Sequence, residues 1–203
     1  VPLSFFFILT LFFMARYIRG SQNNRLWVYL IGLSSGLSFI SIEVGIVTLV
    51  MSILYMTLIR RLDIKNLVIL GVSFLLATSP FWIPMIVIDD ARNLTLTYLK
   101  WQSERLPNYP LDFYAGILSI NALGVVLSGL CILSTIYAFK TKGFHNPSVL
   151  LLVWIAVPLL VFQLLPVKGF YFMVSLIPSF VILGISFLFG SWISRIPHSS
   201  ILR

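Results

Sequence analysis

Residues 27–59 read WVYLIGLSSGLSFISIEVGIVTLVMSILYMTLI, and this run decides the fold. It holds 33 residues and a single charge, Glu43. At 1.5 Å per residue, one straight helix of that length would measure about 50 Å, well beyond a hydrocarbon core of roughly 30 Å. Basic residues stand at both ends, with Arg25 before the run and Arg60 and Arg61 after it. Cytoplasmic loops of membrane proteins collect Lys and Arg, so both ends are predicted to lie on one side of a membrane.

The run is therefore predicted to enter the bilayer and return as two short helices, about 27–41 and 44–59, broken around 41–45. Gly32, Gly36 and Gly45 permit close helix packing or a break. The alternative is a single strongly tilted helix over the whole run. The two topologies place all later segments on opposite sides of the membrane, so the prediction of sidedness depends on this choice.

The composition of the whole chain indicates the same environment. Its 203 residues are 59% hydrophobic and 10% charged, with a mean hydropathy of +1.02, whereas a soluble domain is about 45–50% apolar and about 25% charged. This excludes a soluble enzyme, a secreted disulfide module, a disordered tail and a DNA-binding domain. The single Cys131 supports neither a disulfide framework nor a cysteine metal site within the chain. An integral, multi-pass membrane protein without a nucleic-acid partner is predicted.

The remaining apolar runs extend this topology outward from the hairpin. Further spans are predicted at 1–17, 66–88, 113–139, 148–166 and 170–193. With the hairpin counted as two, the fold is all-α and polytopic, with about seven membrane helices in a single transmembrane domain over 1–203. Pro80 and Pro84 predict a bend near the outer end of the 66–88 span. The chain begins Val-Pro-Leu inside an apolar run, and we expect it to be a fragment of a longer protein.

The charges test this topology. The predicted cytoplasmic side carries ten basic residues against one acid, Asp63, and the predicted outer side carries four basic residues against four acids. The ten are Arg16, Arg19, Arg25, Arg60, Arg61, Lys65, Lys140, Lys142, Arg195 and Arg203. This asymmetry explains the net charge of +8, and it arises only if 27–59 is a hairpin.

Glu43 is the first candidate site residue. A carboxylate at membrane depth is costly and usually faces a cavity or a partner. We consider two roles for it: lining a substrate cavity at the hairpin tip, or fixing the hairpin as a neutral, hydrogen-bonded group.

The long polar segment 89–112, predicted to be an extracytoplasmic loop, holds further candidates. Lys100 or Arg105 would meet a phosphate there, and Trp101 with Gln102 would line a cavity for a sugar or lipid. The alternative is an ordinary connecting loop with an interfacial aromatic belt.

The local structure of that segment is ambiguous in the sequence. Leu94, Tyr98 and Trp101 fall at helical spacing, which suits a helix lying on the membrane surface. Leu94, Leu96 and Tyr98 also alternate as in a strand, so both structures stay open.

Lys168 is the third candidate. It lies in a tight turn predicted to be on the outer side, where the positive-inside trend disfavours lysine. We consider an ammonium that faces a lipid-linked phosphate, with Tyr171 lining the same cavity, and alternatively a snorkelling lysine that binds bulk headgroups.

Three stretches resemble a known family when read in order. They are Gly32-Leu33-Ser34-Ser35-Gly36-Leu37-Ser38-Phe39-Ile40-Ser41-Ile42-Glu43-Val44-Gly45, then Ser79-Pro80-Phe81-Trp82, then Lys168-Gly169-Phe170-Tyr171-Phe172-Met173-Val174-Ser175-Leu176-Ile177-Pro178. They are similar to motifs of GT-C fold glycosyltransferases, in the group of dolichyl-phosphate-mannose protein mannosyltransferases and lipid A aminoarabinose transferases. Two positions depart from the family pattern: its usual lysine falls on Ile42, and its usual arginine falls on Phe170.

The resemblance implies an inverting transfer of a sugar from a polyprenyl-phosphate donor to a protein, lipid or glycan acceptor on the extracytoplasmic side. A carboxylate would act as general base, and basic side chains would meet the leaving phosphate. In this family the catalytic acid lies in the first outer loop, which would precede Val1, so the catalytic residue is unknown here. The resemblance makes Lys168, Lys100 and Arg105 candidates for the phosphate role. No cofactor and no metal ligand cluster is evident in the sequence.

Two other classes of function stay open. A transporter or flippase would also use a broken helix and a midplane Glu43, and it needs a second discontinuous helix, which only the Pro80–Pro84 region could supply. A non-catalytic membrane scaffold would have no outward-facing cavity.

Overall fold

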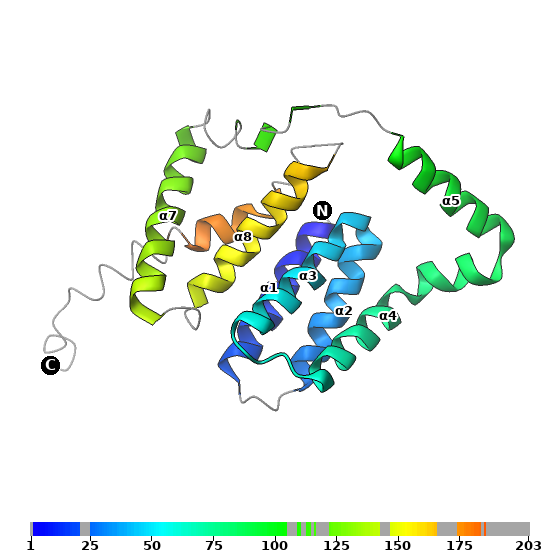
Figure 1. The fold of residues 1–203 in the computed structure, drawn as a ribbon, viewed down its shortest axis with the longest axis horizontal. Helices are drawn as coiled ribbons and strands as arrows, with labels where there is room; N and C mark the ends of the chain where they lie inside the picture. Colours follow the sequence, from blue (N-terminus) through cyan, green and yellow to red (C-terminus); the bar gives the residue numbers. More distant parts are fainter. Residues whose placement is uncertain are drawn as a thin grey trace, which may run out of the picture.

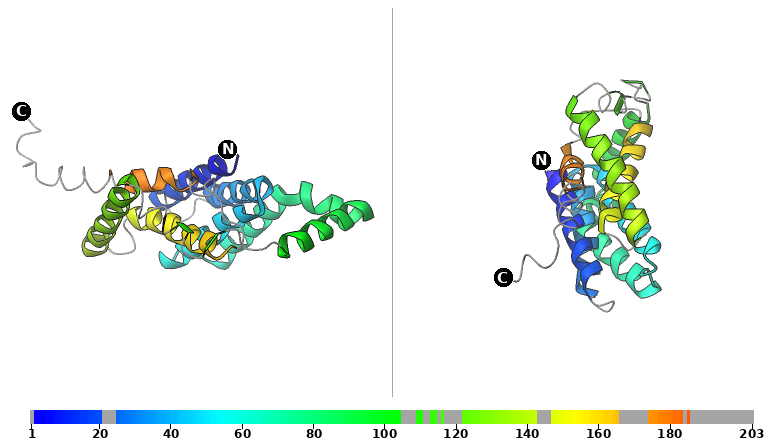
Figure 2. Two further views of the ribbon diagram at one scale, coloured as in Figure 1. Left: turned by 90° about the horizontal axis from the view of Figure 1, so that it is seen from above. Right: turned by 90° about the vertical axis from the view of Figure 1, so that its left-hand side faces the viewer.

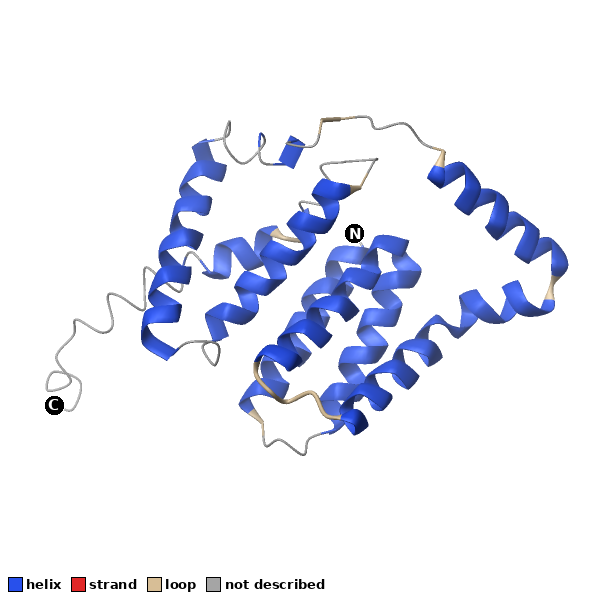
Figure 3. Ribbon diagram, in the orientation of Figure 1, coloured by secondary structure: helices blue, strands red, loops and turns tan. Residues whose placement is uncertain are grey.

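The computed structural model describes residues 2–20, 25–104, 109–110, 113–114, 116, 122–142, 147–165, 174–183 and 185. Over these residues the chain is helical and contains no strand, which confirms the predicted all-α class (Figure 3). The helices are α1 (Pro2–Arg19), α2 (Arg25–Ser41), the short 3-10 helix η1 (Glu43–Ile46), α3 (Val47–Leu58), α4 (Ile64–Val87), α5 (Asp89–Ser103), α7 (Ala122–Lys142) and α8 (Pro147–Leu164). Helices α1–α4 form a bundle, with α5 beyond it on one side and α7 on the other (Figures 1 and 2).

Residues 27–59, the apolar run that decides the fold, form a helical hairpin. Helix α2 ends at Ser41, Ile42 is extended (φ −165°, ψ 142°), and η1 turns the chain into α3. Figure 1 shows α3 returning to the end of the bundle where α2 begins. The turn is tight at Gly45, where a Cβ would collide with the Ser38 carbonyl and lie 2.7 Å from the Phe39 nitrogen. The predicted hairpin is confirmed, and the single tilted helix is wrong.

Small residues bring α2 and α4 together. A Cβ on Gly36 would lie 2.5 Å from Ala77 Cβ and 2.8 Å from the Phe74 carbonyl oxygen, and one on Gly32 would lie 2.6 Å from the Leu70 carbonyl oxygen. Because the obstructing atoms include backbone oxygens, the approach depends on both glycines lacking side chains. This is the small-residue packing that replaces hydrophobic burial between helices in a membrane.

A buried hydrogen bond joins α1 to α2. Thr10 Oγ1 donates to Ser34 Oγ at 2.9 Å, and both residues are buried. Ser34 in turn donates to the Ile31 carbonyl at 3.1 Å, so both hydroxyl groups are satisfied. Polar bonds of this kind add modestly to association between helices in an apolar surrounding.

Helix α3 ends in a left-handed cap. Arg60 has φ 55°, its N–H donates to the Thr57 carbonyl, and the Arg61 N–H donates to the Met56 carbonyl, each at 2.9 Å. These two bonds satisfy carbonyls that the end of a helix otherwise leaves without donors. Glycine is the residue that this position normally favours.

Arg61 then ties the cap to α1 and α4. Its guanidinium donates to the carbonyls of Tyr17 (3.2 Å) and Ile18 (3.0 Å). These two hydrogen bonds cap the last turn of α1. The Tyr17 hydroxyl donates to the Arg61 carbonyl at 3.1 Å, and Asn66 Nδ2 donates to that hydroxyl at 3.2 Å and to that carbonyl at 3.1 Å. Asp63 caps α4 by accepting the Asn66 N–H at 2.6 Å. Three helix ends are fixed by one network.

The prolines of α4 do not end it. The helix continues through Pro80 and Pro84 to Val87, and the chain turns at Ile88 (φ −114°, ψ 114°). Proline removes one amide donor. The Ser79 hydroxyl donates to the Leu76 carbonyl at 2.7 Å, which replaces the bond that the nitrogen of Pro80 cannot make. The helix therefore persists, and the sharp turn lies just beyond it.

Two helix limits differ from their predictions. Residues 113, 114 and 116 of the predicted span 113–139 are helical, and helix α7 (Ala122–Lys142) extends beyond residue 139, through residues that were predicted to be a loop. Basic residues are favourable in the last turn of a helix, where the dipole is negative. Helix α8 begins at Pro147, a residue suited to the first helical position because its missing N–H would be unbonded there.

The described residues at 174–183 lie against α7 through Phe180 and Leu183. Ser134 Oγ donates to the Leu183 carbonyl at 2.8 Å, and Cys131 Sγ lies 3.8 Å from the Phe180 carbonyl oxygen. A side chain–backbone bond here links two segments that are 49 residues apart in sequence.

Among the described helices, α1 and α4 are long and apolar enough to cross a membrane. Their most apolar 18-residue windows have mean hydropathies of 1.4 and 1.8, and only 28% and 22% of these windows is buried. A core helix of a soluble protein would be mostly buried, whereas these two expose apolar side chains as lipid-facing helices do. Along α4 the exposed ones include Val68, Val72, Leu75, Leu76 and Ile83.

Candidate functional site

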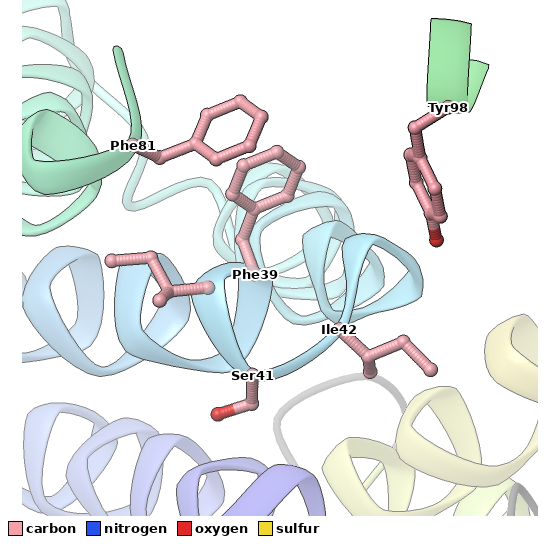
Figure 4. A pocket seen from close by; sticks show the side chains of 6 residues that line it. Phe39, Ser41, Ile42, Phe81 and Tyr98 are labelled. Atoms are coloured by element: carbon pink, nitrogen blue, oxygen red, sulfur yellow. The ribbon is translucent and has the colours of Figure 1, made fainter. Parts of the chain in front are cut away.

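A pocket of about 240 Å³ lies at the hairpin tip. Three elements line it (Figure 4): the end of α2 with the extended residue after it, the outer part of α4, and α5. The lining residues are Phe39, Ile40, Ser41, Ile42, Phe81 and Tyr98. The pocket exists because the break at Ile42 ends α2 and the turn at Ile88 redirects the chain into α5. Figure 1 places the hairpin tip, between α2 and α3, at the end of the bundle opposite to the end of α3.

Aromatic rings form one wall of the pocket. Phe39 meets Phe81 edge to face at 5.9 Å and stacks on Trp82 at 6.1 Å, and Phe81 and Trp82 meet edge to face at 4.8 Å. The Trp82 indole N–H donates to Thr78 Oγ1 at 3.1 Å, which fixes the orientation of the ring. Such contacts add about 0.5–1.5 kcal/mol each beyond burial, so the wall is preorganised. This aromatic wall brings Phe39, from the first of the three stretches that resemble glycosyltransferase motifs, into contact with Phe81 and Trp82 from the second.

Helix α5 provides the opposite side through Tyr98. Residues 89–103 are helical, so the helical spacing of Leu94, Tyr98 and Trp101 was the correct interpretation and the strand-like alternation was not. All three side chains are exposed, at 74%, 37% and 52%. This part of the predicted loop 89–112 is therefore a helix with partly exposed aromatic residues.

The charges of α5 follow the helix dipole. Asp89 and Asp90 lie in its first turn and Lys100 in its last, where each sign is favourable. Asp89 pairs with Arg92, and Lys100 lies 3.9 Å from Glu104. Both are exposed surface pairs, whose contribution to stability is typically 0–1 kcal/mol.

The predicted site residues are distributed as follows. Glu43 begins η1, directly after the pocket-lining Ile42, which places it at the hairpin tip as predicted. Lys100, Trp101 and Gln102 lie on α5 within about one turn of Tyr98, and neither Lys100 nor Trp101 lines the pocket. Arg105, Lys168 and Tyr171 fall outside the described residues.

The residues that line the pocket were not nominated as site residues from the sequence. Phe39 and Phe81 lie within the family-like stretches, and Tyr98 lies on the helical face of α5, so each carried a local signal. Their convergence depends on two backbone turns, which no local pattern encodes. Sequence reasoning favours charged residues, whereas the six residues that line this pocket are all uncharged.

The pocket suits one ring or a short lipid segment. Its volume is below the 300–1,000 Å³ typical of sites for drug-sized ligands. Flat aromatic faces favour the apolar face of a sugar or an isoprene unit. The Ser41 hydroxyl, which donates to the Leu37 carbonyl at 2.8 Å, keeps acceptor capacity for a ligand hydroxyl. Among the described residues no group of three or more His, Cys, Asp or Glu side chains could hold a metal ion.

Comparison of the chain with family models, with curated proteins and with solved structures finds no match.

Proposed function

We propose that this chain is the later part of a multi-pass membrane glycosyltransferase that uses a polyprenyl-phosphate-linked sugar donor. The hairpin-tip pocket would hold part of that donor on the extracytoplasmic side, and the acceptor would be a protein, lipid or glycan. Lys168, Lys100 and Arg105 would meet the donor phosphate, while Glu43, Trp101, Gln102 and Tyr171 would line the cavity around it. No resident cofactor is invoked.

One observation carries the proposal: two stretches distant in sequence, each similar to a glycosyltransferase motif, meet at a single pocket. The hairpin supplies Phe39 and Ile42, and α4 supplies Phe81 from the Ser-Pro-Phe-Trp stretch. A lipid-linked substrate reaches its site through the membrane, and a pocket between apolar helices at one end of a bundle suits that route.

The two rival classes fit the described structure less well. A transporter needs a second discontinuous helix in the Pro80–Pro84 region, and α4 is continuous through both prolines. A scaffold needs no cavity, and a pocket is present at the hairpin tip.

The proposal includes the seven membrane helices predicted from the sequence. Four shorter apolar stretches of helix support this count: Arg25–Ser41 in α2, Val44–Leu58 in η1 and α3, Gly124–Tyr137 in α7 and Val149–Leu164 in α8. Each of these apolar stretches is shorter than α4. In Figure 1 helices α1, α3 and α7 end, and α2, α4 and α8 begin, at the same end of the molecule, as the count of basic residues requires. The opposite end, with the pocket, would face the extracytoplasmic side.

The test is donor binding. The 203-residue chain, purified in detergent, would be titrated with a polyprenyl-phosphate sugar and followed by tryptophan fluorescence. Ile42→Trp fills the pocket, and we expect it to weaken binding at least tenfold. Ile46→Trp is the matched control, since Ile46 belongs to the same tip, is 43% exposed and does not line the pocket.

Transfer itself would be measured in membranes that carry the whole reading frame, because the resemblance places the catalytic acid before Val1. Lys168→Ala should lower transfer there. Equal donor binding by the Ile42→Trp and Ile46→Trp chains would refute the pocket as the donor site. The absence of any acidic outer loop in the whole reading frame would refute the transferase.

A further inference from the structure

Six basic residues gather at the end of the bundle opposite the pocket. Helix α1 ends there, α2 and α4 begin there, and the α3 cap lies between them (Figure 1). The six, called the basic end below, are Arg16, Arg19, Arg25, Arg60, Arg61 and Lys65. The one acid described among them is Asp63, so the basic end has a formal excess of five positive charges.

Two of these six basic residues, Arg61 and Arg16, interact with other groups of the protein. Arg61 donates to two α1 carbonyls, and Arg16 lies over the Phe12 and Trp27 rings at 5.5 and 6.0 Å. Asp63 accepts the Asn66 N–H, which fixes its carboxylate at the start of α4. The ion pairs found among the described residues both lie in or next to α5, so no carboxylate within 4 Å neutralises the basic end.

The remaining four cations are exposed: Arg19, Arg25, Arg60 and Lys65. Two of them stand beside exposed aliphatic residues. Leu26, next to Arg25, is 60% exposed, and Ile64, next to Lys65, is 72% exposed. Charged and apolar side chains side by side at the start of two helices are expected at the boundary between headgroups and acyl chains.

The backbone of Arg60 is a second, independent observation. A non-glycine residue with φ 55° is held at a cost that glycine would avoid. Strain of this kind is informative about function when the side chain is exposed and free to act. Here it projects a cation from the surface between two helix ends.

We propose that the basic end binds the phosphate headgroups of anionic phospholipids in the leaflet that surrounds it. The partner is a lipid rather than a nucleic acid because the cations border exposed aliphatic side chains, which a polynucleotide would leave in water. This goes beyond the proposed transferase, and it involves the opposite end of the bundle, so either proposal can fail alone.

The test uses the full chain in a neutral detergent, titrated with phosphatidylglycerol and with phosphatidylcholine and followed by native mass spectrometry. Each basic side chain near an anionic surface is worth roughly fivefold in affinity. Arg60→Gln with Lys65→Gln should therefore weaken phosphatidylglycerol binding about thirtyfold and leave phosphatidylcholine binding unchanged. Glutamine keeps the strained backbone at position 60, so the variant isolates the charge.

The matched control is Arg92→Gln, which removes one arginine from α5 and is compared with Arg60→Gln alone. An equal loss of phosphatidylglycerol binding in this control would overturn the proposal, because the effect would then follow net charge alone. Equal binding of the two lipids by the unchanged chain would also overturn it. So would displacement of the lipid by an equal concentration of inorganic phosphate or of a short DNA strand.

Discussion

Replacing Gly36 by alanine should separate α2 from α4. The added Cβ would lie 2.8 Å from the Phe74 carbonyl oxygen and 2.5 Å from Ala77 Cβ. Ordinary contact begins at 3.4 Å, so the helices must move apart by roughly 0.6 Å (3.4 Å less 2.8 Å) to relieve the Phe74 contact and by roughly 0.9 Å (3.4 Å less 2.5 Å) to relieve the Ala77 contact. Phe74 presents a backbone oxygen, which cannot rotate away as a side chain can.

The magnitude follows from two opposing terms. Overpacking of a well-packed contact costs about 1–3 kcal/mol. Alanine is the better helix former by about 0.8–1.0 kcal/mol, which offsets part of that cost. Gly71 on α4 has nothing within 4 Å of its Cβ position, so Gly71→Ala brings the propensity gain alone. The two variants should differ by about 1–3 kcal/mol, with Gly36→Ala the less stable.

The assay is reversible unfolding in mixed micelles, followed by far-UV circular dichroism as the fraction of denaturing detergent rises. Ala77→Gly removes one of the two obstructing groups, so the double variant Gly36→Ala with Ala77→Gly should recover part of the loss. If Gly36→Ala is as stable as Gly71→Ala, the close approach of the two helices described above is wrong.

Three further substitutions probe the cap and the bundle. Arg60→Gly should stabilise the chain by about 0.5–1 kcal/mol in the same unfolding assay, because glycine adopts φ 55° without strain; any destabilisation contradicts the left-handed cap. Arg61→Gln should destabilise it by about 1.5–3 kcal/mol through loss of two charge-assisted bonds to α1 carbonyls, with Lys65→Gln as control; equal effects would deny those bonds. Thr10→Val removes the bond to Ser34 and should cost about 0.6–1.7 kcal/mol, and a neutral result would mean that this bond contributes nothing.

Much of the fold was predictable because the prediction of a membrane environment limits how long apolar runs can be arranged. A run of 33 apolar residues with arginines at both ends cannot cross once without extreme tilt, and the hairpin followed from that length. The break came where Glu43 and Gly45 interrupt the run. The C-terminal limit of α7 was less predictable, because apolar composition alone does not mark where a helix ends.

The candidate site was only partly predictable. The hairpin tip was identified from Glu43, a single charge in an apolar run. The aromatic wall was not, because Phe39 and Phe81 look like any other apolar residues of their helices until the packing of α2 on α4 brings them within 5.9 Å. The Arg61 network was also invisible, since it joins residues up to 49 positions apart.

The sequence by itself determined the helical class, the apolar surroundings, the hairpin and the separation of charge between the two ends, because each of these follows from the length, the periodicity and the composition of local runs. The tertiary structure alone decided which side chains share the pocket, how closely the glycines of α2 approach α4, and which arginine caps α1. These depend on the relative placement of helices, and that placement is set by backbone contacts of a few ångströms between residues that lie far apart in the chain.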